Sequence, residues 1–349
     1  MLIVYIIILL LAFYVLAKIV DDYFVAALDE IAVKLKMSHD AAGATLMAIG
    51  SSAPELFVAL FAVLRPGNHE AIGIGNIVGS ALFNLLAIIG VSAIVRKAVI
   101  AKQAVLRDLF FYSIAIILLL ITLIDGKITY PEAGLLLGVY VVYVFTVIKW
   151  RKIFKYHDPD DEAEPEIKTK KKNKSFLRKA LAPIDYVINL FFPPLKYHIP
   201  VFFISIIFIA GISWILVESA VQIARIAEIS ETIIALTILA AGTSVPDLIS
   251  SLIVSKQGRG GMAISNAVGS NIFDILVGLG LPFLLIIIIS GETVGINAGN
   301  IEESVWFLLA SILIVLFFFI INRWKVGKIF GSFLIFLYAA YLVWAVVNI

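Results

Sequence analysis

Two carboxylic acids, Glu55 and Asp247, stand inside apolar stretches of the sequence, each directly after a proline. An ionisable side chain within an apolar membrane helix is costly unless it is paired with an opposite charge or hydrated. Neither stretch contains a lysine or an arginine, so neither acid has a counter-charge in its own segment. Two explanations remain, a protonated and hydrogen-bonded carboxyl group or a bound cation, and we favour the bound cation.

Hydroxyl side chains precede both acids at the same two positions. They stand four and three residues earlier, as Ser51 and Ser52 in the first stretch and as Thr243 and Ser244 in the second. Side chains three or four residues apart share one face of a helix. The prolines cannot donate a backbone hydrogen bond to Gly50 and Gly242, so we expect each helix to kink or break and to free carbonyl oxygens at membrane depth. Carboxylate, hydroxyl and carbonyl oxygens together suit a hard cation.

A second polar motif follows each acid after a short loop. It pairs a serine with an amide or a carboxyl group four residues later, as Ser80 with Asn84 and as Ser270 with Asp274. This spacing places both members of a pair on one helix face, where they could complete an oxygen cage. The three carboxylates Glu55, Asp247 and Asp274 can reach a charge of −3, which suits Ca²⁺ with a monovalent cation, or several Na⁺ ions. Mg²⁺ is less favoured because it resists dehydration.

These two motifs form an internal repeat. Residues 43–56 align with 235–248 at an offset of 192, and residues 73–86 align with 263–276 at an offset of 190. Two matches at nearly one offset predict two copies of one unit. If each copy holds five membrane spans, an odd number, the second copy is inverted relative to the first. Inverted repeats with interrupted helices are typical of secondary transporters, whereas a cation channel, the alternative, does not need them.

The composition places the chain in a membrane. Of 349 residues 62% are hydrophobic and 15% are charged, and the apolar runs approach the ~20 residues that cross a bilayer. We predict an all-α membrane protein with ten transmembrane helices in two inverted five-helix repeats, 1–149 and 200–349, joined by a linker at 150–199. The first run lacks the charged leader and cleavage site of a signal peptide, so we interpret it as a span. The predicted spans are 2–20, 41–64, 71–95, 109–124, 130–149, 200–224, 231–255, 262–290, 302–321 and 327–347.

The basic residues predict the orientation, because lysine and arginine concentrate in cytoplasmic segments. With the N-terminus outside, 24 of the 27 basic residues lie inside, and only Arg65, Lys127 and Arg225 lie outside. We therefore predict both termini outside, a cytoplasmic linker, and a location in the plasma membrane or the bacterial inner membrane.

Several functional classes are disfavoured. The chain has no cysteine, which removes thiolate metal sites and cysteine nucleophiles, and its net charge of +2 marks no nucleic-acid partner. An intramembrane enzyme would need a Ser–His pair, two facing aspartates or a metal with histidine ligands, and all four histidines fall in loops or at span ends. We predict a protein that is not an enzyme and has no cofactor and no obligate protein partner. Its partners would be inorganic cations and the lipid bilayer.

At these motifs the sequence resembles the cation/Ca²⁺ exchanger superfamily. G-S-S-A-P-E-L-F at 50–57, G-T-S-V-P-D-L-I at 242–249 and V-G-S-N-I-F-D-I at 268–275 are similar to the K⁺-dependent Na⁺/Ca²⁺ exchangers. Prokaryotic Na⁺/Ca²⁺ exchangers are somewhat less similar. Weaker similarity continues at R-D-L-F-F-Y (107–112) and N-R-W-K (322–325), and the G-N-x-x-E motifs of the Ca²⁺/H⁺ branch are missing.

The resemblance implies a secondary active antiporter that exchanges Na⁺ for Ca²⁺ by alternating access, with a Ca²⁺/H⁺ antiporter as the alternative. It implies a Ca²⁺ site between Glu55 and Asp247, Na⁺ sites around it, and a first helix in each half that slides over a fixed core. Matched residue by residue, the other ligands would be the hydroxyls of Ser51, Ser52, Thr243 and Ser244, the carbonyls of Ala48 and Ala240, the side chains of Asn84 and Asp274, and Ser80 and Ser270 as outer ligands.

K⁺ transport stays open at this stage. Asp274 resembles the carboxylate tied to K⁺ dependence in animal proteins, but prokaryotic members can carry it without needing K⁺. Ser51 stands where several family members have Thr or Gly, so the matching Na⁺ site can differ. The short linker leaves no room for the Ca²⁺-sensing domains of animal Na⁺/Ca²⁺ exchangers.

Overall fold

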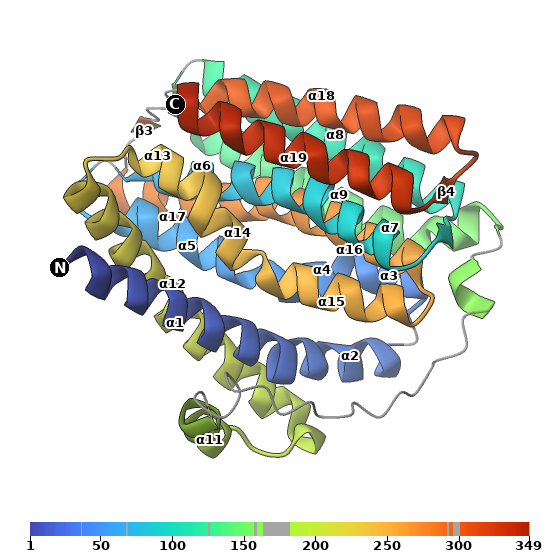
Figure 1. Ribbon diagram of the computed structural model, residues 1–349, viewed down its shortest axis with the longest axis horizontal. Helices are drawn as coiled ribbons and strands as arrows, with labels where there is room; N and C mark the ends of the chain where they lie inside the picture. The colour runs from blue at the N-terminus through green and yellow to red at the C-terminus, as the bar shows by residue number, and fades with distance from the viewer. Residues whose placement is uncertain are drawn as a thin grey trace.

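A computed structural model describes residues 1–35, 37–67, 69–124, 126–156, 159–162, 182–291, 293–295 and 301–348. This part of the chain is almost entirely helical, with long helices stacked side by side (Figure 1). Within it, eight helical stretches are long and apolar enough to cross a membrane, and two bent helix pairs raise that number to ten. The chain is thus a multi-pass membrane protein. If each bent pair is one span, the total is ten, which is the number that the sequence predicts.

The first half of the chain and the linker contain α-helices, π-helical segments (η1–η3), 3₁₀ segments (η4, η5) and short strands. In chain order they are α1 (Leu2–Ile19), η1 (Val20–Phe24), α2 (Val25–Lys34), α3 (His39–Ala42), η2 (Gly43–Met47), α4 (Ala48–Ser51), α5 (Ala53–Leu64), α6 (Glu70–Leu82), η3 (Phe83–Ile88), α7 (Ile89–Val95), β1 (Ala98–Val99), α8 (Lys102–Ile124), β2 (Lys127–Ile128), α9 (Tyr130–Ile153), η4 (Pro159–Glu162), α11 (Ala182–Phe191) and η5 (Leu195–Tyr197).

The second half repeats the order of long helices and strands of the first half, with two π-helical segments where the first half has three. It contains α12 (His198–Ala227), α13 (Glu231–Ile234), η6 (Ala235–Leu239), α14 (Ala240–Thr243), α15 (Val245–Lys256), α16 (Gly260–Phe273), η7 (Asp274–Leu279), α17 (Gly280–Ser290), β3 (Val294–Gly295), α18 (Ile301–Ile321), β4 (Lys325–Val326) and α19 (Lys328–Asn348). The observed helices differ most from the predicted spans in where they begin and end. The first helical run continues to Leu28, and α8 begins seven residues before the predicted start at residue 109.

Two spans bend where the sequence predicts a break. The bends join Asp40–Ser51 to Ala53–Leu64 at 42° and Glu231–Thr243 to Val245–Lys256 at 41°. At each bend a serine leaves helical geometry, Ser52 with φ −92° and ψ 3° and Ser244 with φ −82° and ψ 5°. Pro54 and Pro246 then occupy the first turn of the new helix, where no backbone N–H is required. The predicted kinks are therefore confirmed.

The two bent spans match each other residue for residue. Segments η2, α4 and α5 begin and end 192 residues before η6, α14 and α15, which is the offset found between the sequence motifs. The π-helical segments therefore precede the bend at the same distance in both halves.

Two small sheets connect the halves. Strand β1 pairs antiparallel with β4, with Ala98 opposite Val326, and β2 pairs antiparallel with β3, with Lys127 opposite Gly295. In the first half β1 and β2 flank α8, and in the second half β3 and β4 flank α18. The first strand of either half thus pairs with the second strand of the other half.

Hydrophobic side chains gather in two main clusters. The larger one joins α6–α9 to α16–α19, and the smaller one centres on α1, α2 and α12, with contributions from α5 and η6. Helices α1 and α12 pack against each other and lie along one edge of the molecule, with the bent spans between them and the remaining helices (Figure 1).

Glycines allow the straight helices α6 and α16 to touch the bent spans. A Cβ atom on Gly79 would lie 2.4 Å from the carbonyl oxygen of Leu236, and one on Gly269 would lie 2.6 Å from the carbonyl oxygen of Ala44. The two contacts are equivalent by the sequence repeat. Each brings a serine-bearing helix of one half against the bent span of the other.

We predict that Gly79→Ala and Gly269→Ala each destabilise the protein by about 1–3 kcal/mol, because the added methyl group meets backbone that cannot move aside. The check is thermal unfolding of the purified protein in detergent. Gly138→Ala is the control, since nothing lies within 4 Å of its Cβ position. Unchanged melting of both variants would show that the helices do not approach as closely as described.

Candidate functional site

The predicted site residues converge in the interior, where α6 and α16 meet the two bends. Glu55 lies in the first turn of α5 and Asp247 in the first turn of α15, the helices that follow the bends. All of the predicted site residues have an exposed fraction of 0%: Ala48, Ser51, Ser52, Glu55, Ser80, Asn84, Ala240, Thr243, Ser244, Asp247, Ser270 and Asp274. The fold therefore brings together residues that are far apart in sequence and hides all of them from solvent.

Glu55 is held by hydroxyl groups from both halves. Its Oε1 accepts a hydrogen bond from Ser244 Oγ at 3.2 Å and lies 3.5 Å from Ser80 Oγ. Ser80 Oγ is also 2.7 Å from Ser244 Oγ and 3.5 Å from Asp274 Oδ2. One hydroxyl proton cannot satisfy three acceptors at once, so the carboxylates around Ser80 remain short of donors.

Asp247 is held by the equivalent elements with the halves exchanged. Asn84 Nδ2 donates to its Oδ2 at 2.8 Å, and Ser270 Oγ donates to its Oδ1 at 3.0 Å. Ser51 Oγ lies 3.5 Å from Ser270 Oγ and donates to the Met47 carbonyl at 2.9 Å. Each acid of a bent span thus contacts the straight helices and the opposite half.

The carbonyls predicted as ligands lie at the bends. The Ala48 oxygen accepts from Ser52 N at 3.0 Å, and the Ala240 oxygen accepts from Ser244 N at 3.1 Å and from Thr243 Oγ1 at 3.3 Å. Both carbonyls are therefore already hydrogen-bonded, and the Ala240 oxygen has a donor for each of its two lone pairs.

Several oxygens of the site have no hydrogen-bond partner among the residues that the structure describes. These buried atoms are Ser52 Oγ, Glu55 Oε2, Asn84 Oδ1 and Asp274 Oδ1. Buried polar atoms without partners are rare and call for an explanation such as a bound ion or water. The described residues contain no group of three or more His, Cys, Asp or Glu side chains suited to a metal ion. A cation here would therefore also need the hydroxyl, amide and carbonyl oxygens, a set that Na⁺ and Ca²⁺ accept.

Two buried asparagines at the site were not among the predicted residues. Asn76 Oδ1 accepts from Thr243 Oγ1 at 3.3 Å, and Asn271 Nδ2 donates to the Ala81 carbonyl and to Tyr112 OH, both at 2.9 Å. The signal for Asn76 is in the sequence, because Asn76 stands four residues before Ser80 on the same helix face. A similar signal exists for Asn271, which stands three residues before Asp274.

A second buried charged cluster, near one end of the bent span, is neutralised by its own residues. Arg107 donates from Nε to Asp108 Oδ1 at 2.7 Å and from Nη1 to Asp40 Oδ2 at 3.3 Å. Asp108 also accepts from Ser265 Oγ on α16 at 3.0 Å and from Tyr143 OH on α9 at 3.2 Å. This cluster ties α3, α8 and α9 to the helix that carries Ser270 and Asp274.

Tyr156, just beyond α9, completes the cluster by donating to Asp40 Oδ2 at 2.7 Å. Burial, followed by the charge of Asp40, raises the pKa of the Tyr156 hydroxyl above its usual range. Tyr156 therefore stays a proton donor at physiological pH, and the linker begins at a fixed point.

Comparison with known proteins relates this chain to one family. A family model described as sodium/calcium exchanger protein matches residues 5–149 and 197–347 of the chain. The human protein sodium/potassium/calcium exchanger 4 is 27% identical over an alignment that covers 96% of this chain and 79% of that protein. Sodium/potassium/calcium exchanger 1 of Gallus gallus is 28% identical, with 95% and 76% covered. A solved structure of the sodium-calcium exchanger NCX_Mj, soaked with 2.5 mM Na⁺ and 10 mM Sr²⁺, covers 100% of both chains at 24% identity with a TM-score of 0.64, which indicates a shared fold.

We predict that Arg107→Gln destabilises the protein by about 3–5 kcal/mol, because it leaves Asp108 buried without its counter-charge and leaves Asp40 with Arg151 alone. Thermal unfolding in detergent measures this. The same substitution at the exposed Arg225 is the control, and its cost should stay within about 0.5 kcal/mol. If the two variants melt at the same temperature, the cluster does not hold these helices together.

Proposed function

Because the chain belongs to the sodium/calcium exchanger protein family, we propose that it is a secondary active antiporter that exchanges Na⁺ for Ca²⁺ by alternating access. One observation carries the proposal most directly. Glu55, Asp247 and Asp274 are buried close to shared hydroxyl groups, and within the described residues no lysine or arginine forms an ion pair with any of them. A bound cation is the natural partner for such a group of acids inside a membrane protein.

In the proposed site, Ca²⁺ binds between Glu55 and Asp247, and Na⁺ ions bind around it. The hydroxyls of Ser51, Ser52, Thr243 and Ser244, the carbonyls of Ala48 and Ala240, and the side chains of Asn84 and Asp274 supply further oxygens, with Ser80 and Ser270 as outer ligands. The unpaired oxygens of Ser52, Glu55, Asn84 and Asp274 support this assignment. A hydroxyl that now donates to a carboxylate can rotate and present a lone pair to a cation.

The charge of the site explains why ions would be exchanged rather than released in one direction. Two carboxylates balance one Ca²⁺ or two Na⁺ ions. An empty site would carry uncompensated negative charge in a dry interior, which is costly. The transition between the two access states is therefore easier with ions bound, and the binding of one ion species accompanies the release of the other. Asp274 stands at the position that Asn84 occupies in the first half. It adds a third acid to the site, which could bind K⁺ for co-transport.

The two halves, 1–149 and 200–349, would be inverted five-helix repeats around this site. The matching bends, the reciprocal strand pairing of β1 with β4 and of β2 with β3, and the equivalent glycine contacts support this arrangement. The distribution of basic residues supports both termini outside and the linker at 150–199 in the cytoplasm.

Helices α1 and α12 would be the moving part. They are the first long helices of the two halves, they pack against each other, and their hydrophobic cluster is separate from the larger one (Figure 1). Sliding this pair along the bent spans would open the site to one side of the membrane and then to the other, without breaking the larger cluster.

Proteoliposomes loaded with Na⁺ should take up ⁴⁵Ca²⁺ when they are diluted into Na⁺-free buffer, because the outward Na⁺ gradient drives the exchange. The same measurement with and without K⁺ decides whether K⁺ is co-transported. Liposomes with equal Na⁺ on both sides are the control. If uptake instead requires a pH gradient and does not depend on Na⁺, the proposal is wrong and the protein is a Ca²⁺/H⁺ antiporter.

Glu55→Gln and Asp247→Asn should each abolish this uptake, since each substitution removes one of the two central charges without changing the size of the side chain. Size-exclusion chromatography and thermal unfolding should show that both variants remain folded. Glu303→Gln, at an exposed acid in the first turn of α18, should transport normally. Normal Ca²⁺ flux in either central variant refutes the assignment of the site.

A further inference from the structure

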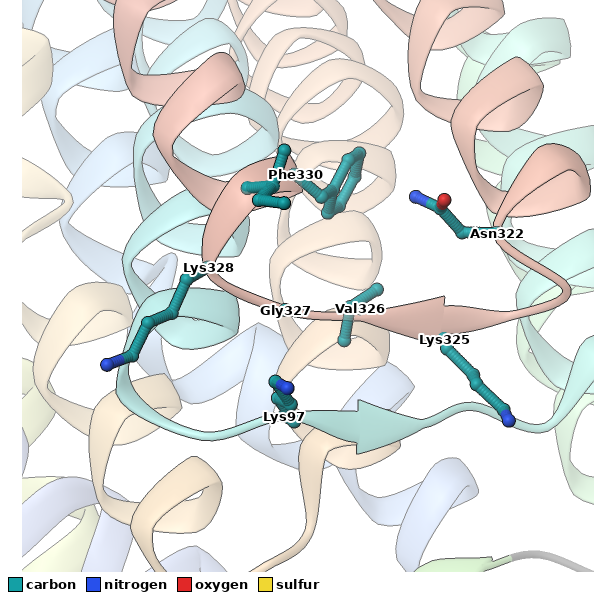
Figure 2. Close-up of a pocket in the computed structure, with 8 residues that line it drawn as sticks. Lys97, Asn322, Lys325, Val326, Gly327, Lys328 and Phe330 are labelled. Atoms are coloured by element: carbon teal, nitrogen blue, oxygen red, sulfur yellow. The ribbon is translucent and has the colours of Figure 1, made fainter.

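A basic pocket lies at the end of the molecule where β1 pairs with β4, away from the central site. Its volume is about 510 Å³, and it is formed by the chain around β4 together with one side chain that precedes β1 (Figure 2). Three lysines, Lys97, Lys325 and Lys328, line it together with Asn322. Buried Val326 and Phe330 form its apolar part.

No acidic residue balances these lysines locally. None lines the pocket, and none forms an ion pair with the three lysines in the described part of the chain. The sequence has no Asp or Glu between residues 96 and 106 or from residue 304 to the last residue. Arg96, Lys102 and Arg323 add further positive charge on the same two segments. Such a site attracts an anion.

The shape of the pocket is fixed by a strained turn. Arg323 and Trp324, between Asn322 and Lys325, have positive φ values of 51° and 63°, which are unfavourable for residues other than glycine. Backbone hydrogen bonds from Trp324 N to the Phe319 carbonyl at 2.8 Å and from Ile100 N to the Trp324 carbonyl at 3.0 Å hold the turn. Lys325 and Asn322 therefore face the pocket from a rigid loop.

The side chain of Lys97 is also held in place. A Cβ on Gly327 would lie 3.3 Å from Lys97 Cγ, so the aliphatic part of this lysine packs on the turn before α19. Lys102 Nζ lies 5.9 Å from the centre of the Trp324 ring. Lys97 therefore packs along the turn, while Lys325 and Lys328 extend from it to either side, and all three lysines are exposed (Figure 2).

An exposed apolar stripe begins at the pocket. Ile329, which lines the pocket, has an exposed fraction of 90%, and Phe336 and Val343 follow on the same face of α19 with 68% and 67%. In a membrane protein such a face contacts lipid chains. A ligand of this pocket can therefore place an anionic group among the lysines and an apolar chain along α19.

The other sheet provides an internal comparison. The segments around β2 and β3 contain Lys127 together with the acids Asp125 and Glu292, although the repeat makes the two sheets equivalent. The general preference of basic residues for the cytoplasmic side explains the number of lysines at the first sheet. It does not explain why the described residues that line this one pocket include three lysines and no acid.

We propose that this pocket binds the phosphate headgroup of an anionic phospholipid, with the acyl chains lying along Ile329, Phe336 and Val343. Each lysine near an anionic membrane surface contributes about a fivefold gain in binding. Basic pockets between membrane helices are known to suit anionic headgroups for this reason. The apolar stripe distinguishes a lipid from a soluble phosphate.

The test is native mass spectrometry of the full-length protein, purified in detergent and incubated with phosphatidylglycerol, phosphatidylcholine or inorganic phosphate. The key variant is Lys97→Gln/Lys325→Gln/Lys328→Gln, and the corresponding triple Lys→Arg variant keeps the charge. The matched control, Lys152→Gln/Lys155→Gln/Lys196→Gln, removes three exposed lysines that do not share this pocket. Thermal unfolding without lipid confirms that each variant is folded.

The wild type, the Arg variant and the control should retain phosphatidylglycerol in preference to phosphatidylcholine. The Gln variant at the pocket should lose this preference by about tenfold or more, as expected from three lysines. An unchanged preference in the pocket variant, or an equal loss in the matched control, overturns the proposal. Displacement of the lipid by millimolar inorganic phosphate would also overturn it, because the site would then be one for soluble anions.

Discussion

The central constraint on this protein is the presence of buried acids that no basic residue of the described structure neutralises. Glu55, Asp247 and Asp274 have an exposed fraction of 0%, and their partners in the described structure are hydroxyl and amide groups. Such acids are unfavourable in a membrane interior unless a cation joins them. The bends, the close helix contacts and the arrangement of the halves all serve to collect oxygen atoms around these acids.

The contrast between the two buried charged clusters clarifies their roles. Around Arg107, the acids Asp40 and Asp108 are balanced by two guanidinium groups, those of Arg107 and Arg151, and hydroxyl groups donate to both acids, so the cluster is complete without any ligand. Around Glu55, the described residues supply no equivalent positive charge, and several oxygens have no hydrogen-bond partner among them. A neutralised cluster can hold helices together through a transport cycle, whereas an incomplete one can change its ions.

The backbone is adapted to the same purpose. Each bent span has a π-helical segment, a serine with non-helical dihedral angles and a proline in the next turn. Gly79 and Gly269 let α6 and α16 approach these spans, which brings Ser80 and Ser270 next to the acids. Local irregularity and close packing are therefore parts of one arrangement.

The sequence by itself determined the features that depend on nearby residues. Apolar runs predicted the spans, proline and glycine positions predicted the bends, and the spacing of Ser51, Ser52 and Glu55 predicted a shared helix face, because these properties follow from local geometry and from the bilayer. The internal repeat in the sequence also predicted which residues of the two bent spans correspond to each other. The family match agreed with the motifs as well.

Only the tertiary structure decided which residues meet across the repeat. Asn84 donates to Asp247, 163 positions away, and Ser244 donates to Glu55, 189 positions away. Asn271 donates to the Ala81 carbonyl, 190 positions away, and Lys97 and Lys325 line one pocket for the same reason. Such contacts depend on how whole helices pack, on the glycines that set their separation, and on strand pairs between distant segments, none of which is contained in the spacing of residues along one helix.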